Sequence, residues 1–298
     1  MSGIGLVLGA GGLPGEAFHR GVLRALLDQR GISGRDAEVV VGTSAGSLVA
    51  ASLRLPRSGP VPGRVQSPDV RPSDEEPRVR PLPDFAALAG YARRPWRARP
   101  ARLTAALLPP GRQSTAMLQE PLRRRFGETW PERHTWIVAA SRRDGRRVVF
   151  GRDRFDSDLA TAVAASCAIP GYFQPVTIGG ESFVDGAVHS PTNADLLAGQ
   201  GLDLVIVSAP MGVRPRLARP VIELPLRLAW HAQLAAEALA VRRSGTQVLV
   251  VEPAGSMLRL FGTNPVDARR IDEIEDRAYD LTVHLLHRRS TPVASYAD

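Results

Sequence analysis

The chain has 298 residues, enough for one large α/β domain or two ordinary ones, and its 44% hydrophobic content excludes wholesale disorder. All 38 basic residues are arginine and the net charge is +8, but the arginines are scattered and aromatic residues make up only 5% of the chain. This distribution argues against a nucleic-acid partner, whereas the charge is compatible with peripheral contact with an anionic lipid surface.

The single cysteine, Cys167, excludes an internal disulfide and any multi-cysteine metal site. No apolar run approaches the roughly 20 residues of a membrane span. No basic stretch precedes the first apolar residues, as a secretory signal would require. We therefore expect a cytoplasmic protein without a signal peptide or transmembrane segment, and the sequence leaves its oligomeric state open.

The N-terminal part alternates strand and helix patterns. Residues 4–8 predict an apolar strand that runs into the glycine-rich segment 9–15, and a helical spacing of apolar residues continues to Leu27. Residues 39–41 (Val-Val-Val) predict a second buried strand, and small and apolar residues through Leu53 predict a second helix. This alternation is the start of an α/β layer fold.

The character changes after the second helix. Residues 55–84 are rich in proline and arginine and show no sustained apolar period, which predicts a loop or a disordered insertion. Residues 85–126 regain helical spacing, so we expect a helical cap segment over residues 85–134. We interpret residues 1–298 as one domain that carries these two segments as insertions.

The C-terminal half returns to an α/β pattern. Residues 135–140 predict a strand, and residues 146–151 predict its hairpin partner across the turn Asp144-Gly145. Further strands are predicted at residues 181–184, 204–208 and 247–252, and helices at residues 159–168, 224–243 and 266–288. No internal repeat interrupts this order.

The pentapeptide Gly42-Thr43-Ser44-Ala45-Gly46 is the sharpest chemical signal. A serine on a tight strand-to-helix turn is exposed at the carboxyl edge of a sheet, and its neighbours must be small because the chain packs closely on both sides. The following helix N-terminus favours developing negative charge. Because a strand precedes the motif and a helix follows it, a nucleophilic Ser44 is favoured over an ordinary tight turn.

The glycine-rich segment has competing interpretations. The spacing of Gly9, Gly12 and Gly15 also occurs in dinucleotide-binding folds, but these require an acidic residue at the end of the second strand, where this chain has Gly42. The alternative is an oxyanion hole, in which backbone N–H groups of Gly11 and Gly12 bind the carbonyl oxygen of an ester. A simple strand-to-helix turn is the remaining interpretation.

A serine nucleophile needs a base, and the six histidines do not lie in a recognisable triad context. His19 lies in the first predicted helix, and His189 lies four residues after Asp185. Asp185-Gly186 follows a strand, and it would be a β-turn if it had no chemical role. A carboxylate that acts directly as the base is the more economical hypothesis.

With these motifs in view, the chain resembles the patatin-like phospholipase family of lipid acyl hydrolases. Residues 6–15 are similar to the family's oxyanion loop, and residues 42–46 match its nucleophile turn. Residues 165–175 (Ala-Ser-Cys-Ala-Ile-Pro-Gly-Tyr-Phe-Gln-Pro) and residues 183–187 (Phe-Val-Asp-Gly-Ala) resemble two further family motifs in the family's order. The resemblance covers residues 1–53 and about 135–252.

The resemblance implies a three-layer α/β/α fold with a mostly parallel central sheet. It also implies a Ser-Asp dyad, with Ser44 as nucleophile and Asp185 as general base, and an oxyanion hole at Gly11, Gly12 and Leu13. The supporting motif positions are Gly9, Gly15, Gly42, Gly46 and Gly186. The implied substrate is a lipid or another acyl ester, cleaved through an acyl-enzyme without a metal or an organic cofactor. Cys167 is interpreted as a buried packing residue.

One position departs from the family pattern, because Pro14 stands where the family usually has arginine or lysine. That cation is thought to steady the loop or an anionic substrate, and proline also removes a backbone N–H. Arg20 lies five residues into the helix as a speculative replacement. The departure makes a neutral glyceride, a simple ester or a thioester a fair alternative substrate. It also supports a second hypothesis, a catalytically impaired lipid-binding or scaffold protein on the same fold.

Overall fold

The computed structural model describes residues 3–55, 111, 113–126, 129–214, 223–255, 257–262 and 264–288. The chain divides into two compact units. Unit 1 combines Met1–Leu53 with Pro191–Asp298, and unit 2 is Arg54–Ser190. The prediction of one domain over residues 1–298 stays a prediction.

Unit 1 is built on a parallel sheet in the order β2-β1-β7-β8. The strands are β1 (Ile4–Leu8), β2 (Val39–Thr43), β7 (Leu204–Ser208) and β8 (Gln247–Val251). Leu6 is in register with Val40 on one side and Ile206 on the other, and all three are buried. Strands covered on both faces are apolar at nearly every position, which is why the sequence shows continuous apolar runs there.

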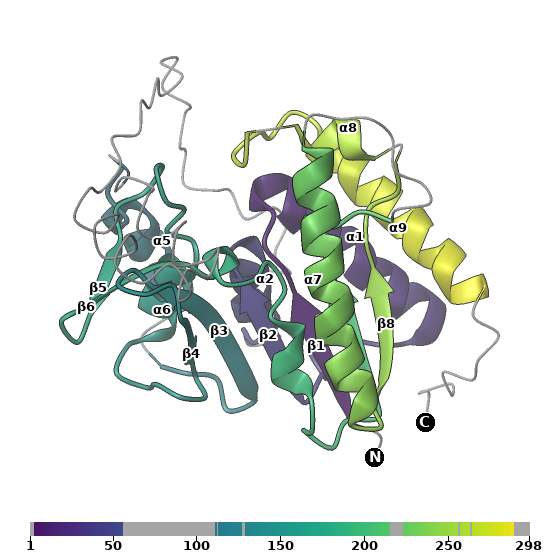
Figure 1. Ribbon diagram of the computed structural model, residues 1–298, viewed down its shortest axis with the longest axis horizontal. Coiled ribbons are helices and arrows are strands. Elements are labelled where there is room, and N and C mark those ends of the chain that lie inside the picture. Colours follow the sequence, from purple (N-terminus) through teal and green to yellow (C-terminus); the bar gives the residue numbers. More distant parts are fainter. Residues whose placement is uncertain are drawn as a thin grey trace, which may run out of the picture. The chain divides into compact units, whose positions relative to one another are not determined.

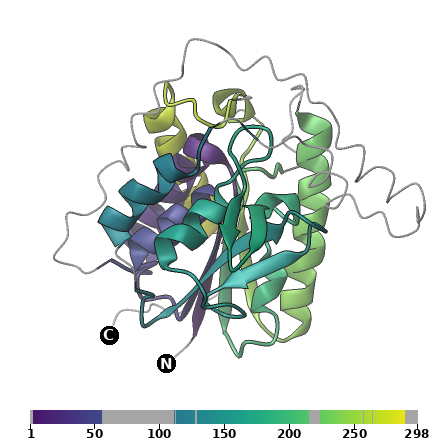
Figure 2. The same ribbon diagram turned by 90° about the vertical axis from the view of Figure 1, so that its left-hand side faces the viewer.

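Helices cover both faces of this sheet. They are α1 (Gly12–Arg30), α2 (Ala45–Leu53), α7 (Leu224–Arg243), α8 (Leu258–Phe261) and α9 (Ile271–Arg288), with a short 3₁₀ helix, η3 (Ala194–Leu197). Figures 1 and 2 show α7 on one face and α1 with α9 on the other. The predicted α/β class, with helical layers on both sides of a parallel central sheet, is confirmed.

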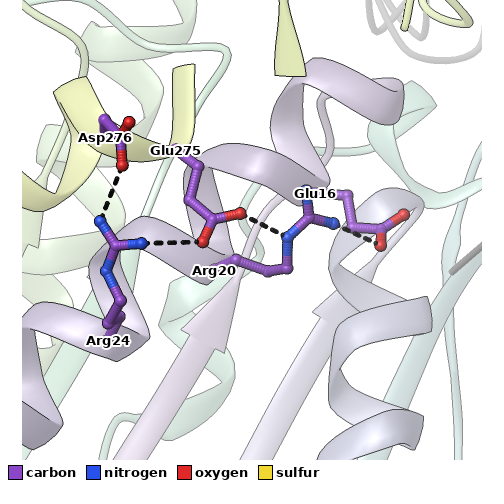
Figure 3. A network of polar contacts seen from close by, with 5 residues as sticks. All are labelled: Glu16, Arg20, Arg24, Glu275 and Asp276. Atoms are coloured by element: carbon purple, nitrogen blue, oxygen red, sulfur yellow. Dashed lines mark hydrogen bonds and ion pairs between the residues drawn. The ribbon is translucent and has the colours of Figure 1, made fainter. Parts of the chain in front are cut away.

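The contact between α1 and α9 is close and ionic. A Cβ added at Gly21 would lie 2.1 Å from the carbonyl oxygen of Glu275, so the two backbones approach more closely there than any other residue would allow. Figure 3 shows Arg20 and Arg24 of α1 bridging to Glu275 and Asp276 of α9. The same network includes Glu16, four residues before Arg20 on α1.

Unit 2 contains antiparallel strands. These are β3 (His134–Ser141), β4 (Arg147–Phe150), β5 (Val176–Ile178) and β6 (Glu181–Asp185), and β3 pairs with both β4 and β6 while β5 pairs with β6. The helices are α5 (Ala116–Phe126), α6 (Leu159–Ser166) and the 3₁₀ helix η2 (Gly186–Val188). The predicted hairpin across Asp144-Gly145 is confirmed. The ring of its Phe150 lies 5.3 Å from the ring of Phe183 on β6.

Several predicted boundaries were wrong. The last helix begins at Ile271 and not at residue 266, and the short strand β5 and helix α8 were not predicted. Helix α6 begins at the residue after Asp158, whose carboxylate accepts the N–H of Thr161 at 2.7 Å, and it ends at Ser166, two residues before the predicted end. Local capping and tertiary contacts set these ends, which apolar spacing does not resolve.

The two predicted insertions lie largely outside the described residues. Of residues 55–84 only Leu55 is described. Of the predicted cap, residues 85–134, the described part includes α5 and the first residue of β3, His134. Both predictions therefore stay predictions. Among the described helices, none combines the length and hydropathy that a membrane crossing requires.

Candidate active site

Ser44 occupies the turn between β2 and α2 with a strained backbone. Its φ is +54°, and Asn193 is the only other non-glycine residue with a positive φ among the described residues. Its carbonyl oxygen accepts the N–H of Ser47 at 2.8 Å and the hydroxyl of Ser47 at 2.6 Å. Such a backbone costs about 1–3 kcal/mol and persists where the surrounding structure imposes it, typically at functional sites.

The glycines on either side of Ser44 are required by space. A Cβ at Gly46 would lie 2.0 Å from the carbonyl oxygen of Leu8, and a Cβ at Gly42 would lie 2.6 Å from the Cα of Ser47. The start of α2 therefore packs directly on the end of β1. This is the crowding that a serine nucleophile on a strand-to-helix turn requires of its neighbours.

The glycine-rich segment that follows β1 is fixed by backbone hydrogen bonds. The N–H of Gly9 donates to Ser208 at 3.0 Å, and the N–H of Ala10 donates to Pro191 at 2.8 Å. Gly12 has a φ of +62°, and a Cβ there would lie 2.1 Å from the carbonyl oxygen of Pro265. Only glycine satisfies both the dihedral angle and the close approach at this position.

The three amides predicted for the oxyanion hole are not equivalent. The N–H of Leu13 donates to the carbonyl oxygen of Pro265 at 2.8 Å, so in this structure it already has an acceptor. The amides of Gly11 and Gly12 stand at the beginning of α1, and neither donates to an acceptor within the described residues. The first N–H groups of a helix have no acceptor within the helix, so these two are available to a developing oxyanion.

His19 binds the backbone of the glycine-rich segment at Gly9. It is fully buried, with Nε2 2.7 Å from the carbonyl oxygen of Gly9 and Nδ1 2.7 Å from the hydroxyl of Ser208. A carbonyl oxygen only accepts, so Nε2 carries the proton and Nδ1 accepts from the hydroxyl. Burial lowers the pKa of His19 to about 4, which keeps the ring neutral. The sequence placed His19 outside any recognisable triad context and did not predict these two contacts.

Arg20, which the sequence suggested as a replacement for the missing loop cation, forms ion pairs with two glutamates. Arg20 donates through Nε to Glu275 at 2.8 Å and through Nη1 to Glu16 at 3.0 Å (Figure 3). Less than a quarter of each glutamate side chain is exposed. Arg20 therefore stabilises the contact between α1 and α9 and does not replace the cation that Pro14 displaces.

Asp185 lies in unit 2, at the end of β6, and is 3% exposed. Its carboxylate accepts the N–H of Ala187 at 2.8 Å, and its own N–H donates to Ala168 at 2.9 Å. Asp185 thus begins the 3₁₀ helix η2 that contains Gly186. The Asp-Gly pair is therefore a strand-to-helix junction with a buried carboxylate.

From the sequence, Cys167 is interpreted as a buried packing residue. Cys167 is half-buried and not buried, because it is the residue at which α6 ends, with its N–H donating to Val163 at 3.0 Å. His231 contacts the carboxylate of Glu252 at 2.8 Å. The part of the chain that the structure describes contains no group of three or more histidine, cysteine, aspartate or glutamate side chains placed to hold a metal.

The chain is similar both to a solved structure and to a known protein family. Among solved structures, VipD from Legionella pneumophila matches with 13% sequence identity and a TM-score of 0.42, over 96% of this chain and 67% of that chain. The family described as "Patatin-like phospholipase" matches residues 6–198, a span that contains the glycine-rich segment, Ser44 and Asp185. Because the match extends over more than half of the sequence, this chain belongs to the patatin-like phospholipase family.

Proposed function

We propose that this protein is a serine acyl hydrolase that cleaves carboxylic ester bonds of lipids, as a phospholipase A or lipase does. The observation that carries the proposal is the backbone of Ser44, held at a φ of +54° between two glycines that leave no room for a Cβ. A strained serine at the end of a parallel strand is the geometry that presents a nucleophile. Membership of a family of lipid acyl hydrolases supports the lipid substrate.

In the proposed reaction, the Ser44 hydroxyl attacks the ester carbonyl carbon while the carboxylate of Asp185 takes its proton. The tetrahedral intermediate places its negative oxygen against the amides of Gly11 and Gly12. Collapse expels the alcohol, which takes the proton from Asp185, and leaves an acyl-enzyme on Ser44. Water then attacks the acyl carbon, again giving a proton to Asp185, and the carboxylic acid leaves as Ser44 regains its proton.

The oxyanion contribution rests on few donors. Removal of one oxyanion donor typically costs about 2.7–4 kcal/mol of transition-state stabilisation. Gly11 and Gly12 are the available amides, whereas the Leu13 amide contributes only if its bond to Pro265 opens. We therefore assign the oxyanion to Gly11 and Gly12 and treat Leu13 as a donor that is blocked in this structure.

A fluorophosphonate probe and a short-chain nitrophenyl ester test the proposal. Ser44→Ala should abolish both labelling and hydrolysis, whereas Ser52→Ala, in the helix α2 that follows Ser44, should retain them. Asp185→Asn should fold and lose turnover, whereas Asp158→Asn, which removes a charge but keeps the side-chain acceptor that caps α6, should keep both turnover and stability. Full esterase activity in the double variant Ser44→Ala/Asp185→Asn would rule out the dyad.

The substrate class needs its own experiment. Pro14 in place of a cation makes neutral glycerides, simple esters and thioesters alternatives to phospholipids, so a lipid extract treated with wild type and Ser44→Ala should be profiled. Loss of phospholipid with release of fatty acid in the wild-type sample alone would identify a phospholipase. Flotation with anionic and neutral vesicles would test the proposed peripheral membrane contact.

The bond from Leu13 to Pro265 favours a second candidate, a catalytically impaired lipid-binding or scaffold protein. A site that no longer catalyses a reaction would tolerate a hydrogen bond that occupies the predicted oxyanion donor of Leu13. The retention of Ser44 in a strained turn argues for catalysis, because strain without function has no reason to persist. Vesicle binding without any probe labelling would favour this second candidate.

A further inference from the structure

Arg227, in the first turn of α7, is a buried cation held by backbone carbonyls. It is 6% exposed, and its Nη1 donates to the carbonyl oxygens of Pro210 at 2.9 Å and Gly212 at 3.2 Å. Its Nε has no hydrogen-bond acceptor among the described residues. Burial lowers the pKa of Arg227, and the charge of Glu223 offsets this only in part. A cation buried in this way is expensive unless something else in the fold depends on it.

The carbonyl that Arg227 binds belongs to a residue that packs on the glycine-rich segment. The Cγ atom of Pro210 lies 2.8 Å from the position that a Cβ of Gly11 would take, and 3.2 Å from that of Gly15. The ring of Pro210 therefore lies directly against the backbone of both glycines. Any shift of Pro210 would change the orientation of the Gly11 amide and of the first turn of α1.

A second contact leads from Arg227 to the same helix. The guanidinium carbon lies 5.1 Å from the centroid of the Phe261 ring, within the range of a cation–π interaction. Phe261 in turn contacts Phe18 of α1, with ring centroids 6.1 Å apart. One buried guanidinium thus joins the segment after β7, helix α8 and, through them, both the loop and the body of α1.

We propose that Arg227 is a positioning residue for the oxyanion loop, acting through Pro210 to hold the amides of Gly11 and Gly12 toward the acyl group. This inference rests on the proposed acyl hydrolase function. Guanidinium suits the task because its rigid donors bind two carbonyl oxygens from one nitrogen and keep their charge when buried. Its positive charge also lies beside a loop that must stabilise a negative oxygen, in a medium of low dielectric constant.

The test compares Arg227→Met, which has similar length and no charge, with Arg227→Lys, which keeps the charge. Arg227→Met should lower kcat by about ten- to a hundredfold, less than direct loss of an oxyanion donor, with KM changed by no more than about twofold. Arg227→Lys should recover part of that loss. Fluorophosphonate labelling of Ser44 should slow in parallel. Arg243→Met, an exposed arginine in the last turn of α7, is the matched control and should keep wild-type kcat.

A double-mutant cycle tests the route through Pro210. Pro210→Ala removes the ring that packs on Gly11 and Gly15, so it should lower kcat in the same range as Arg227→Met. If both act on the same loop, the double variant should be about as slow as the slower single variant. Loss factors that multiply would show that Arg227 does not act through Pro210.

The outcomes separate this inference from the proposed function. A wild-type protein without Ser44-dependent hydrolysis would overturn the proposed function. An active wild type together with a folded Arg227→Met of unchanged kcat would overturn only the role of Arg227. A kcat for Arg227→Lys as low as that of Arg227→Met would overturn the contribution of the charge by itself and would leave the guanidinium geometry as the cause. If Arg227→Met fails to fold by circular dichroism, Arg227→Lys and Pro210→Ala decide: wild-type kcat in both would overturn the proposal.

Discussion

The Nε2 atom of His19 donates a hydrogen bond to the carbonyl oxygen of Gly9 across 2.7 Å in the buried interior of unit 1. This bond connects the first helix to the segment that precedes it, and the hydroxyl of Ser208 completes the arrangement at the end of β7. The position of the proposed oxyanion loop therefore depends on a neutral imidazole.

Stability should fall as the pH decreases from about 6.5 to about 4. The unfolded chain binds a proton at His19 below its ordinary pKa of 6.5, whereas the folded chain resists protonation down to about 4. The unfolded state thus holds more protons in this window, and the free energy of unfolding drops by about 3 kcal/mol across it. His19→Gln keeps a neutral donor near Gly9, so its urea unfolding should lack this part of the slope. Equal pH dependence in both proteins would contradict the assignment.

Gly46→Ala should destabilise the protein strongly. The new Cβ would lie 2.0 Å from the carbonyl oxygen of Leu8, a clash with backbone that no side-chain rotation relieves. We expect a loss above about 3 kcal/mol or failure to fold. The control is Gly31→Ala, where alanine would have to adopt a φ of 64° but has open space around it, so the loss should be only about 1 kcal/mol. Thermal melts of both variants make the comparison, and similar losses would refute the close packing at Gly46.

Ser44→Gly and Ser44→Ala should differ in stability although both should be inactive. Alanine keeps a Cβ on a backbone with a φ of +54°, whereas glycine adopts that angle without strain. We expect the glycine variant to be more stable than the alanine variant by about 1 kcal/mol. Chemical denaturation with a shared slope measures the difference. An alanine variant as stable as the glycine variant would mean that the turn stores no strain.

Arg20→Met should destabilise the contact between α1 and α9 more than Arg24→Met. Arg20 pairs with Glu16, whose side chain is 4% exposed, while the partner Asp276 of Arg24 is 71% exposed. Removing the partner of a buried carboxylate costs about 3–5 kcal/mol in the extreme case, whereas an exposed pair contributes at most about 1 kcal/mol. Equilibrium unfolding of both variants measures the two stability losses. A smaller loss for Arg20→Met than for Arg24→Met would contradict the role of Arg20 in the contact between the helices.

The local features of this protein were predictable because neighbouring residues encode them. The strand of consecutive valines and the glycine at position 42, which lies against Ser47, follow from backbone geometry within a few residues. Gly46 and Gly12 could be recognised as motif positions, although the carbonyl oxygens that exclude a side chain there belong to the distant residues Leu8 and Pro265. The order of the motifs was enough to predict the family and the parallel α/β architecture. Element ends were less predictable, as the start of α9 at Ile271 shows, because capping and packing set them.

The sequence by itself therefore determined the identity of the proposed nucleophile and the need for glycine beside it. Only the tertiary structure decided which hydrogen bonds fix the proposed oxyanion loop. The carbonyl oxygen of Pro265 accepts the N–H of Leu13, and Arg227 donates to the carbonyl oxygen of Pro210. Arg20 donates to Glu275 and is therefore not available to the loop. The physical reason is that Ser44 is defined by the conformation of its own backbone and its neighbours in sequence. The loop's hydrogen-bonding state depends instead on side chains and carbonyls that reach it only when distant segments pack together.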